Sequence, residues 1–179
     1  PDIAATTAAW TIDTTSPTGV SVVNEGDEYA NATSVSISLS SNDAQQVCFS
    51  NDGANYSNWE AMTDTKSWVL SEGEGEKTVY IKYKDVAGNT CVATDSITLD
   101  TVPPDAPVPN PADDLFENIP TLDWEVSAGC AGYILEYDTD VNFSTATRIE
   151  DILPSDYTPD SMLSDGTWYW RVQAVDAAG

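Results

Sequence analysis

Acidic side chains dominate the residues of this chain that could do chemistry. It has 30 Asp and Glu residues, three Cys and no His, so a His-based triad, a His-ligated zinc site and imidazole acid–base chemistry are excluded. Paired carboxylates could still act as a general acid and its partner. The candidate pairs are Asp113-Asp114, Glu150-Asp151 and Asp138 with Asp140. Nothing places any pair in a cleft, so we expect no enzyme and no catalytic residue.

One acidic stretch begins like a calcium-binding loop. Residues 138–142 read Asp-Thr-Asp-Val-Asn, with oxygen ligands at alternate positions. The sixth position is Phe143 instead of Gly and the twelfth is Ile149 instead of Glu, so the stretch fails the EF-hand pattern. We interpret it as a solvated loop after a strand.

The net charge narrows the possible partners. At −24, with only six Lys and Arg residues, the chain lacks the basic cluster that binds nucleic acid or an anionic membrane surface. No apolar run approaches the roughly 18–20 residues of a spanning helix, so we expect no direct membrane insertion. The sequence has no initiator Met and reads as a piece of a longer protein.

Strands must position these acidic residues, because a period of two dominates the hydrophobic pattern. Apolar residues alternate with polar ones in 35–39, 79–83 and 168–174. Turn signals such as Asn51-Asp52-Gly53 and Asp165-Gly166 separate the alternating runs. The pattern predicts an all-β fold.

An internal repeat sets the expected domain boundaries. Thr11-Ile12-Asp13 returns as Thr98-Leu99-Asp100, and the loop 84–89 returns at 175–179. We therefore expect two tandem β-sandwiches, at 16–101 and 102–179, after an orphan strand and linker at 1–15.

The repeat also leads us to expect that the chain is cut out of phase with its domains. In the first domain a last strand follows the 85–89 loop, whereas the second stops at Gly179 within the equivalent loop. The orphan strand carries Trp10 and Ile12, and the groove left open in the second domain is lined by Trp170 and Val172. Two explanations stay open: a longer chain supplies the neighbouring strands, or residues 1–13 of one copy complete the second domain of another by donor-strand addition.

Two stretches resemble known extracellular modules. Residues 16–101, with Phe49-Ser50-Asn51-Asp52-Gly53 and Lys77-Thr78-Val79-Tyr80, resemble bacterial Ig-like repeats. Residues 104–179, with Leu122-Asp123-Trp124 and 165–172, resemble prokaryotic fibronectin type III modules. The resemblance implies two Ig-like/fibronectin type III-like β-sandwiches, preceded by an N-terminal strand that belongs to a preceding or neighbouring domain. It also implies that Trp124 packs against alternate residues of the strand 168–174.

The resemblance brings several acidic residues to the two domain junctions. In Ig-like sandwiches the entering chain lies at the same pole as the loops that would carry the other acids. The first junction would gather Asp13, Asp43, Asp85 and Asn89, and the second would gather Asp100, Asp105 and Asp176. Such oxygen-rich junctions could bind calcium and stiffen an array; plain acidic solubility is the alternative.

The same topology bears on the three cysteines. Cys48 and Cys91 would open two strands near one pole of the first domain, and we predict a disulfide between them in an oxidising compartment. The intervening strand separates them by about 10 Å, beyond the normal reach of about 7 Å, unless Cys91 leans across from its loop. Cys130 has no partner in its domain and would be a free thiol or an intermolecular link.

Asn31, Asn55 and Asn142 each begin an N-glycosylation acceptor pattern. Together with the resemblance, these features predict a structural module of an extracellular, cell-surface array or fibre that spaces domains or assembles head-to-tail. Its partners would be copies of itself or adjacent domains of the same long chain, with no cofactor except possible calcium. The alternative is an adhesive or carbohydrate-binding accessory module of a larger secreted protein.

Overall fold

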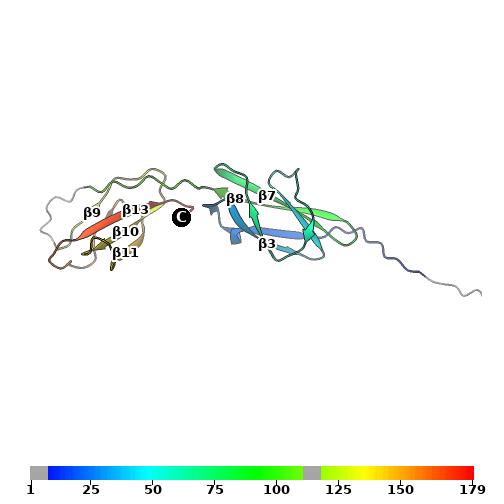
Figure 1. Cartoon of the computed structure of the whole chain (residues 1–179), viewed down its shortest axis with the longest axis horizontal. Helices are drawn as coiled ribbons and strands as arrows, with labels where there is room; N and C mark the ends of the chain where they lie inside the picture. Colours follow the sequence, from blue (N-terminus) through cyan, green and yellow to red (C-terminus); the bar gives the residue numbers. More distant parts are fainter. Residues whose placement is uncertain (1–7, 111–117) are drawn as a thin grey trace, which may run out of the picture. The chain divides into compact units, whose positions relative to one another are not determined.

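The structure is a computed structural model that describes residues 8–110 and 118–179. It divides into two compact units, one that ends at Asp100 and one from Thr101 to Gly179 (Figure 1). Apart from one short 3₁₀ turn, η1 (Asn24–Gly26), all regular structure among these residues is β, which confirms the predicted fold class. No helix in the described ranges is long and apolar enough to cross a membrane.

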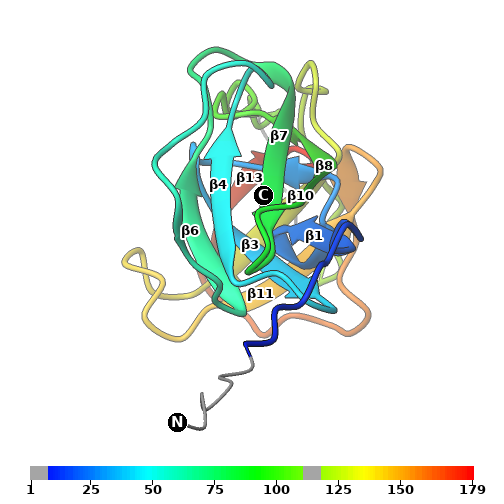
Figure 2. The ribbon, with the colours of Figure 1, turned by 90° about the vertical axis from the view of Figure 1, so that its right-hand side faces the viewer.

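Unit 1 contains two sheets that face each other across one core. Its strands are β1 (Gly19–Val23), β2 (Tyr29–Ala30), β3 (Ser34–Ser41), β4 (Gln46–Ser50), β5 (Glu60–Ala61), β6 (Thr65–Val69), β7 (Gly75–Lys84) and β8 (Thr90–Leu99). One sheet has the order β1-β3-β6 and the other the order β2-β8-β7-β4-β5. All pairs are antiparallel except β2 with β8. Figure 2 shows β7 between β4 and β8.

The core of unit 1 comes from the alternating residues. Val35, Ile37 and Leu39 of β3 and Val79, Ile81 and Tyr83 of β7 are all buried, so the period of two places one face of each strand inside. Two polar contacts tie the sheets together. The Tyr83 hydroxyl donates to the Val20 carbonyl at 2.8 Å, and the Asp95 carboxylate accepts from the Val23 amide at 2.7 Å.

Tyr83 gives unit 1 a predicted alkaline transition. Burial raises the pKa of Tyr83 to about 12, because the charged phenolate is poorly solvated in the core. The stability that comes from the neutral phenol is therefore complete below pH ~10 and is lost as the pH rises through about 12. We expect the free energy of unfolding of Tyr83→Phe to depend less on pH in this range. The wild type should lose about 1–3 kcal/mol more than the variant. Chemical denaturation of unit 1 from pH 8 to 12.5 measures it, and parallel profiles for the two proteins would contradict it.

Unit 2 also consists of two sheets, with fewer strands among its described residues than unit 1. Its strands are β9 (Leu122–Asp123), β10 (Gly132–Asp138), β11 (Thr147–Ile152), β12 (Asp156–Tyr157) and β13 (Tyr169–Val175). They form a β11-β10-β13 sheet and a β12-β9 pair, all antiparallel. The core is built around Trp124, whose ring lies 5.2 Å from Tyr133 and 6.2 Å from Trp170 between centroids. The predicted packing of Trp124 on the 168–174 strand is therefore present at Trp170, while the Trp168 ring lies against Tyr137.

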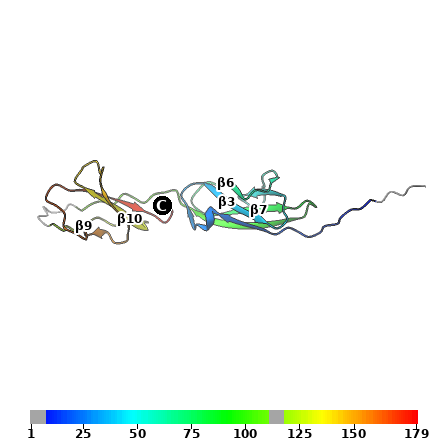
Figure 3. The same cartoon turned by 90° about the horizontal axis from the view of Figure 1, so that it is seen from below.

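The predicted N-terminal strand forms no ladder here. Residues 8–18 are irregular, and the segment after residue 7 is drawn as a coil in Figure 3. A strand needs a neighbour for its amides and carbonyls, and none of the described strands pairs with this segment. Residues 1–7 of the predicted strand lie outside the described residues.

Candidate metal centre

Three carboxylates from distant parts of the chain meet in unit 1. Asp13 precedes β1, Asp43 lies between β3 and β4, and Asp85 lies between β7 and β8. One oxygen of each lies within 4.8 Å of the others. Among the described residues this is the only group of three or more Asp, Glu, Cys or His side chains placed closely enough to share a metal ion.

Asp85 is the buried member of the group, with 4% of its surface exposed. Its carboxylate accepts from the Asn89 backbone amide and from the Asn89 Nδ2, both at 2.8 Å. Burial acts to raise the pKa of Asp85, but the hydrogen bonds from Asn89 and from the amides of Gly88 and Ala87 outweigh it and hold the pKa below its ordinary value. Asp85 is therefore an ionised carboxylate at neutral pH, held in place by these hydrogen bonds.

Asn89 links the segment before β1 to the loop between β7 and β8. Its Nδ2 also donates to the carbonyl oxygen of Asp13 at 3.2 Å. Because the amide nitrogen makes both contacts, Asn89 acts as a positioning residue for Asp13 and Asp85. Metal binding through the Asn89 amide oxygen stays a prediction.

The segment that leads into β1 is also held next to Asp43. The Thr18 amide donates to the Asn42 Oδ1 at 2.8 Å, and the Ser41 hydroxyl donates to the Thr18 carbonyl at 2.6 Å. The same Ser41 oxygen accepts from the amides of Asp43 and Ala44 at 3.3 and 3.0 Å. These contacts fix the turn that carries Asp43 against the segment that carries Asp13.

The group has the chemistry of a calcium site. Three carboxylates this close repel one another, and a hard divalent cation converts the repulsion into attraction. Calcium takes six to eight oxygen ligands in a flexible geometry, so carbonyls and waters would complete its shell around three carboxylates. Asp13, Asp43 and Asp85 are the residues that could hold it.

The second predicted junction is distributed over both units. Asp100 belongs to unit 1, whereas Asp105 and Asp176 belong to unit 2. The Asp176 carboxylate accepts from the amides of Ala178 and Gly179 at 2.9 and 3.0 Å and so closes a turn. Calcium binding by these three residues stays a prediction.

The predicted disulfide is not formed, because Cys48 and Cys91 lie on opposite faces of their sheet. Cys48 pairs with Lys82 and Cys91 with Tyr83, so β7 separates them and successive residues point to opposite sides. Both are free thiols, as is Cys130. The Cys130 thiol contacts the Tyr133 hydroxyl at 3.2 Å at the edge of the unit 2 core.

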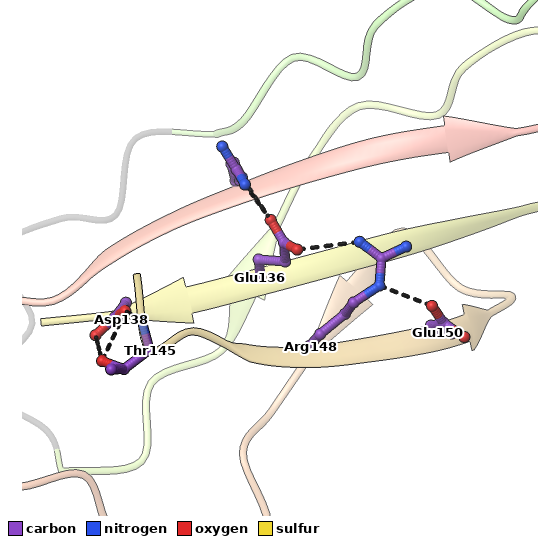
Figure 4. A network of polar contacts seen from close by, with 6 residues as sticks. Glu136, Asp138, Thr145, Arg148 and Glu150 are labelled. Carbon is purple, nitrogen blue, oxygen red and sulfur yellow. Dashed lines mark hydrogen bonds and ion pairs between the residues drawn. The ribbon is translucent and has the colours of Figure 1, made fainter. Parts of the chain in front are cut away.

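Three carboxylates of the remaining acidic pairs have structural partners, and Figure 4 shows those of Asp138 and Glu150. Asp138 is buried and accepts from Thr145, and Asp140 accepts from Asn142 and Ser144. Glu150 pairs with Arg148 at 2.7 Å. Asp113 and Asp114 lie outside the described residues. These contacts give Asp138, Asp140 and Glu150 structural roles in unit 2.

The polar network around Glu136 in unit 2 was not predicted from the sequence. Glu136 accepts from both Arg148 and Arg171 beside a groove of about 280 Å³. Hydrogen bonds from Arg171 and then Arg148 hold the pKa of Glu136 below its ordinary value. Cross-strand register places these side chains together, and register is not readable before the strand pairs are known.

The three glycosylation candidates, Asn31, Asn55 and Asn142, are all exposed. The Asn55 amide donates to Asp52 at 2.6 Å, and the Asn142 amide donates to Asp140 at 3.0 Å. Modification of the three stays a prediction.

The sequence matches no model of a protein family and no curated protein. Among solved structures, the fibronectin(III)-like modules of Clostridium thermocellum CbhA align with a TM-score of 0.58 and 12% identity, over 89% of this chain and 87% of theirs. This likeness supports the β-sandwich, fibronectin type III-type fold.

Two further structures align with TM-scores too low to carry an argument. The PKD1 domain of Vibrio anguillarum Epp has a TM-score of 0.37 and 18% identity, over 50% of this chain and all of that domain. A carbohydrate-binding module of the β-sandwich superfamily has a TM-score of 0.40 and 10% identity, over 93% of this chain and 87% of its own.

Proposed function

We propose that this chain is a non-catalytic structural module of an extracellular, cell-surface protein, in which consecutive β-sandwich units space or assemble a larger array. Calcium at Asp13, Asp43 and Asp85 would fix the segment that enters unit 1. Adjacent domains or further copies of the chain are the partners of such a module. The β-sandwich fold and the net charge of −24 support this role.

The observation that supports this proposal is that the segment before β1 carries one of the three clustered carboxylates. Asp13 lies before the first strand, yet its carboxylate reaches those of Asp43 and Asp85, which sit on two loops of the folded unit. A cation bound there would link the segment to both loops and limit its bending. It would also neutralise part of the charge that makes the chain repel itself.

Calcium is expected to raise the melting temperature of unit 1. Extracellular calcium modules bind with dissociation constants of about 10⁻⁴–10⁻³ M. At ~10 mM calcium and a dissociation constant near 1 mM, binding to the folded state stabilises unit 1 by about 1.4 kcal/mol. For a unit of this size that corresponds to a rise of roughly 5–10 °C. Calorimetry in calcium, and in chelator with NaCl at matched ionic strength, measures the shift.

Asp43→Asn is the variant that identifies the site, because Asp43 is exposed and its loss does not disturb the core. It should lose most of the calcium-dependent rise, while its stability in chelator should stay equal or increase slightly as repulsion falls. Asp64→Asn removes one exposed charge elsewhere in unit 1 and should keep the full rise. Equal shifts in both variants would mean general charge screening and would refute the site.

Two aromatic rings of unit 1, Tyr56 and Trp59, favour the structural role over the carbohydrate-binding alternative. A binding module needs open ring faces on which sugars can stack. Here the Lys82 ammonium lies 4.2 Å from the Tyr56 ring centroid, and the Lys84 ammonium lies 4.1 Å from the Trp59 centroid. Each cation–π contact covers one face of its ring with one of the chain's own side chains.

A further inference from the structure

Two lysines of unit 1 carry positive charge that no carboxylate balances among the described residues. The chain has 30 acidic and six basic side chains, yet all the ion pairs within the described ranges belong to other basic residues. Lys82 and Lys84 instead hold their ammonium groups over the rings of Tyr56 and Trp59. A ring face attracts a cation but has no net charge. The end of β7 that carries these lysines, the lysine end, is therefore a positive patch on a chain of net charge −24.

A groove with two carboxylates lies at the opposite end of β7, the glutamate end. Glu76 lies six residues before Lys82 on the same side of the strand, at a separation of about 20 Å along β7. The groove measures about 270 Å³ and is lined by Glu28, Tyr29, Glu76, Ser96, Ile97 and Thr98. No cation in the described ranges forms an ion pair with Glu28 or Glu76. One face of the sheet therefore carries charges of opposite sign at its two ends.

The surface between the two ends is uncharged. Thr78 and Tyr80 of β7 alternate with core residues and so point to the outside. Their partners on β8 are Ser96 and Thr94, and Val92 is the next residue of β8 on that side. Directly opposite residues of antiparallel strands share one face, so all five side chains point outward. A second molecule can therefore contact the middle of this face without burying a charge.

The two halves of the face also differ in height. β4 pairs only with residues 80–84 of β7, and the loop 51–59 that follows β4 places Tyr56 and Trp59 against the lysines of that half. Residues 75–79 of β7 have no described partner on the side of β4, and the groove lies in their half. A raised positive half is thus joined to a hollowed negative half.

A surface of this kind is complementary to itself. A two-fold axis across the middle of β7, level with Val79, reverses the strand and places the lysine end of one copy on the glutamate end of the other. The same rotation brings each raised half to a hollowed half. An unrelated acidic partner would use the lysines alone and leave the groove without a counterpart. A second copy uses both, so it is the partner that the charges favour.

We propose that two copies of this chain dimerise through the outward faces of β7 and β8, with Lys82 and Lys84 of each copy in the Glu28–Glu76 groove of the other. The proposal rests on the assembling role in the proposed function and names the partner and its surface. Sheets that pack face to face lie about 10 Å apart, a gap that Lys and Glu side chains together can bridge. The contact is isologous, so it closes at two copies.

The like net charge of the two copies opposes the dimer at long range and sets the conditions of the test. Each copy carries −24, and salt of about 0.15 M shortens the range of the repulsion to roughly 8 Å. Sedimentation equilibrium of the 179-residue chain in such salt and in chelator should show masses that rise from monomer toward dimer with concentration. The chelator excludes copies that are bridged by calcium.

Charge reversal identifies the contact. Lys82→Glu and Glu76→Lys should each weaken the dimer by about tenfold or more, because each sets like charges opposite one another twice in a two-fold contact. An equimolar mixture of the two variants should recover association, since one copy then supplies only carboxylates and the other only ammonium groups. The mean net charge of the mixture equals that of the wild type, so a general electrostatic effect cannot produce this recovery.

Lys84→Gln and Lys77→Gln form a matched pair that keeps a long polar side chain on β7. Each removes one positive charge. Lys77, however, lies on the other side of the strand and donates to the Glu72 carbonyl at 3.2 Å. Lys84→Gln should weaken the dimer by roughly threefold or more, whereas Lys77→Gln should associate like the wild type.

A wild type that stays monomeric up to millimolar concentration would overturn the proposal. So would association that survives Lys82→Glu, or a mixture of Lys82→Glu and Glu76→Lys that recovers nothing. Polyglutamate that binds a monomeric wild type but not Lys82→Glu would assign the face to an acidic partner instead. The calcium-dependent melt of the Glu76→Lys protein is scored separately, because Glu76 lies at the end of β7 remote from Asp85. A failed dimer and a failed metal site therefore remain distinguishable.

Discussion

Replacing Gly19 with Ala is expected to destabilise unit 1 by about 3 kcal/mol or more, at the upper end of the cost of overpacking a core. A Cβ at Gly19 would lie 2.7 Å from Cγ of Tyr83 and closer still to two other ring atoms. The ring cannot retreat, because Tyr83 is fully buried and its hydroxyl is bound to the Val20 carbonyl one residue further along β1. The added methyl must therefore separate β1 from the sheet that carries β7.

The expected fall in the melting temperature of unit 1 is about 12 °C or more, as measured by calorimetry. Ser21→Ala is the matched control on the same face of β1. Its hydroxyl oxygen is buried without a hydrogen-bond partner, so its removal should be neutral or slightly stabilising. Tyr83→Leu in the Gly19→Ala background should recover part of the loss. A Gly19→Ala protein as stable as wild type would mean that β1 does not lie against Tyr83.

The long strands were predictable because burial follows a period of two. Val35, Ile37 and Leu39 alternate with serines in the sequence and are all buried in β3. The two-residue strands β2, β5, β9 and β12 were not predictable, since a period of two needs more residues to be visible. The strand expected around Trp10 has the right pattern but no partner among the described residues, and pattern alone does not supply a ladder.

The candidate metal site was predictable only through topology. Asp13, Asp43 and Asp85 are far apart in the sequence, and the resemblance to Ig-like sandwiches brought them to one pole. The positioning role of Asn89 depends on a turn that places its side chain on two partners, which residue types do not reveal. The predicted disulfide was wrong, and the alternation of core-facing residues around Cys48 could have excluded it. Cys48 lies between the buried core residues Val47 and Phe49, so it faces away from the core against which Cys91 packs.

Unit 2 should depend on Trp124 more than unit 1 depends on any single side chain. Only six residues form its buried core, and Trp124 is 2% exposed between Tyr133 and Trp170. Trp124→Ala should cost about 3–5 kcal/mol, which for so small a core is enough to abolish the unit 2 transition near 37 °C. The unit 1 transition should not move, and it provides an internal reference in the same calorimetric scan.

Two further variants, one at Trp124 and one on the exposed face of β13, test how far unit 2 depends on Trp124. Trp124→Phe keeps an aromatic ring in the core and removes less volume than Trp124→Ala. It should therefore cost clearly less than Trp124→Ala. Tyr169→Ala removes an aromatic ring from the exposed face of β13 and should cost less than about 1 kcal/mol. If Trp124→Ala lowered both transitions together, the two units would not unfold independently. If all three variants melted alike, the core of unit 2 would not be centred on Trp124.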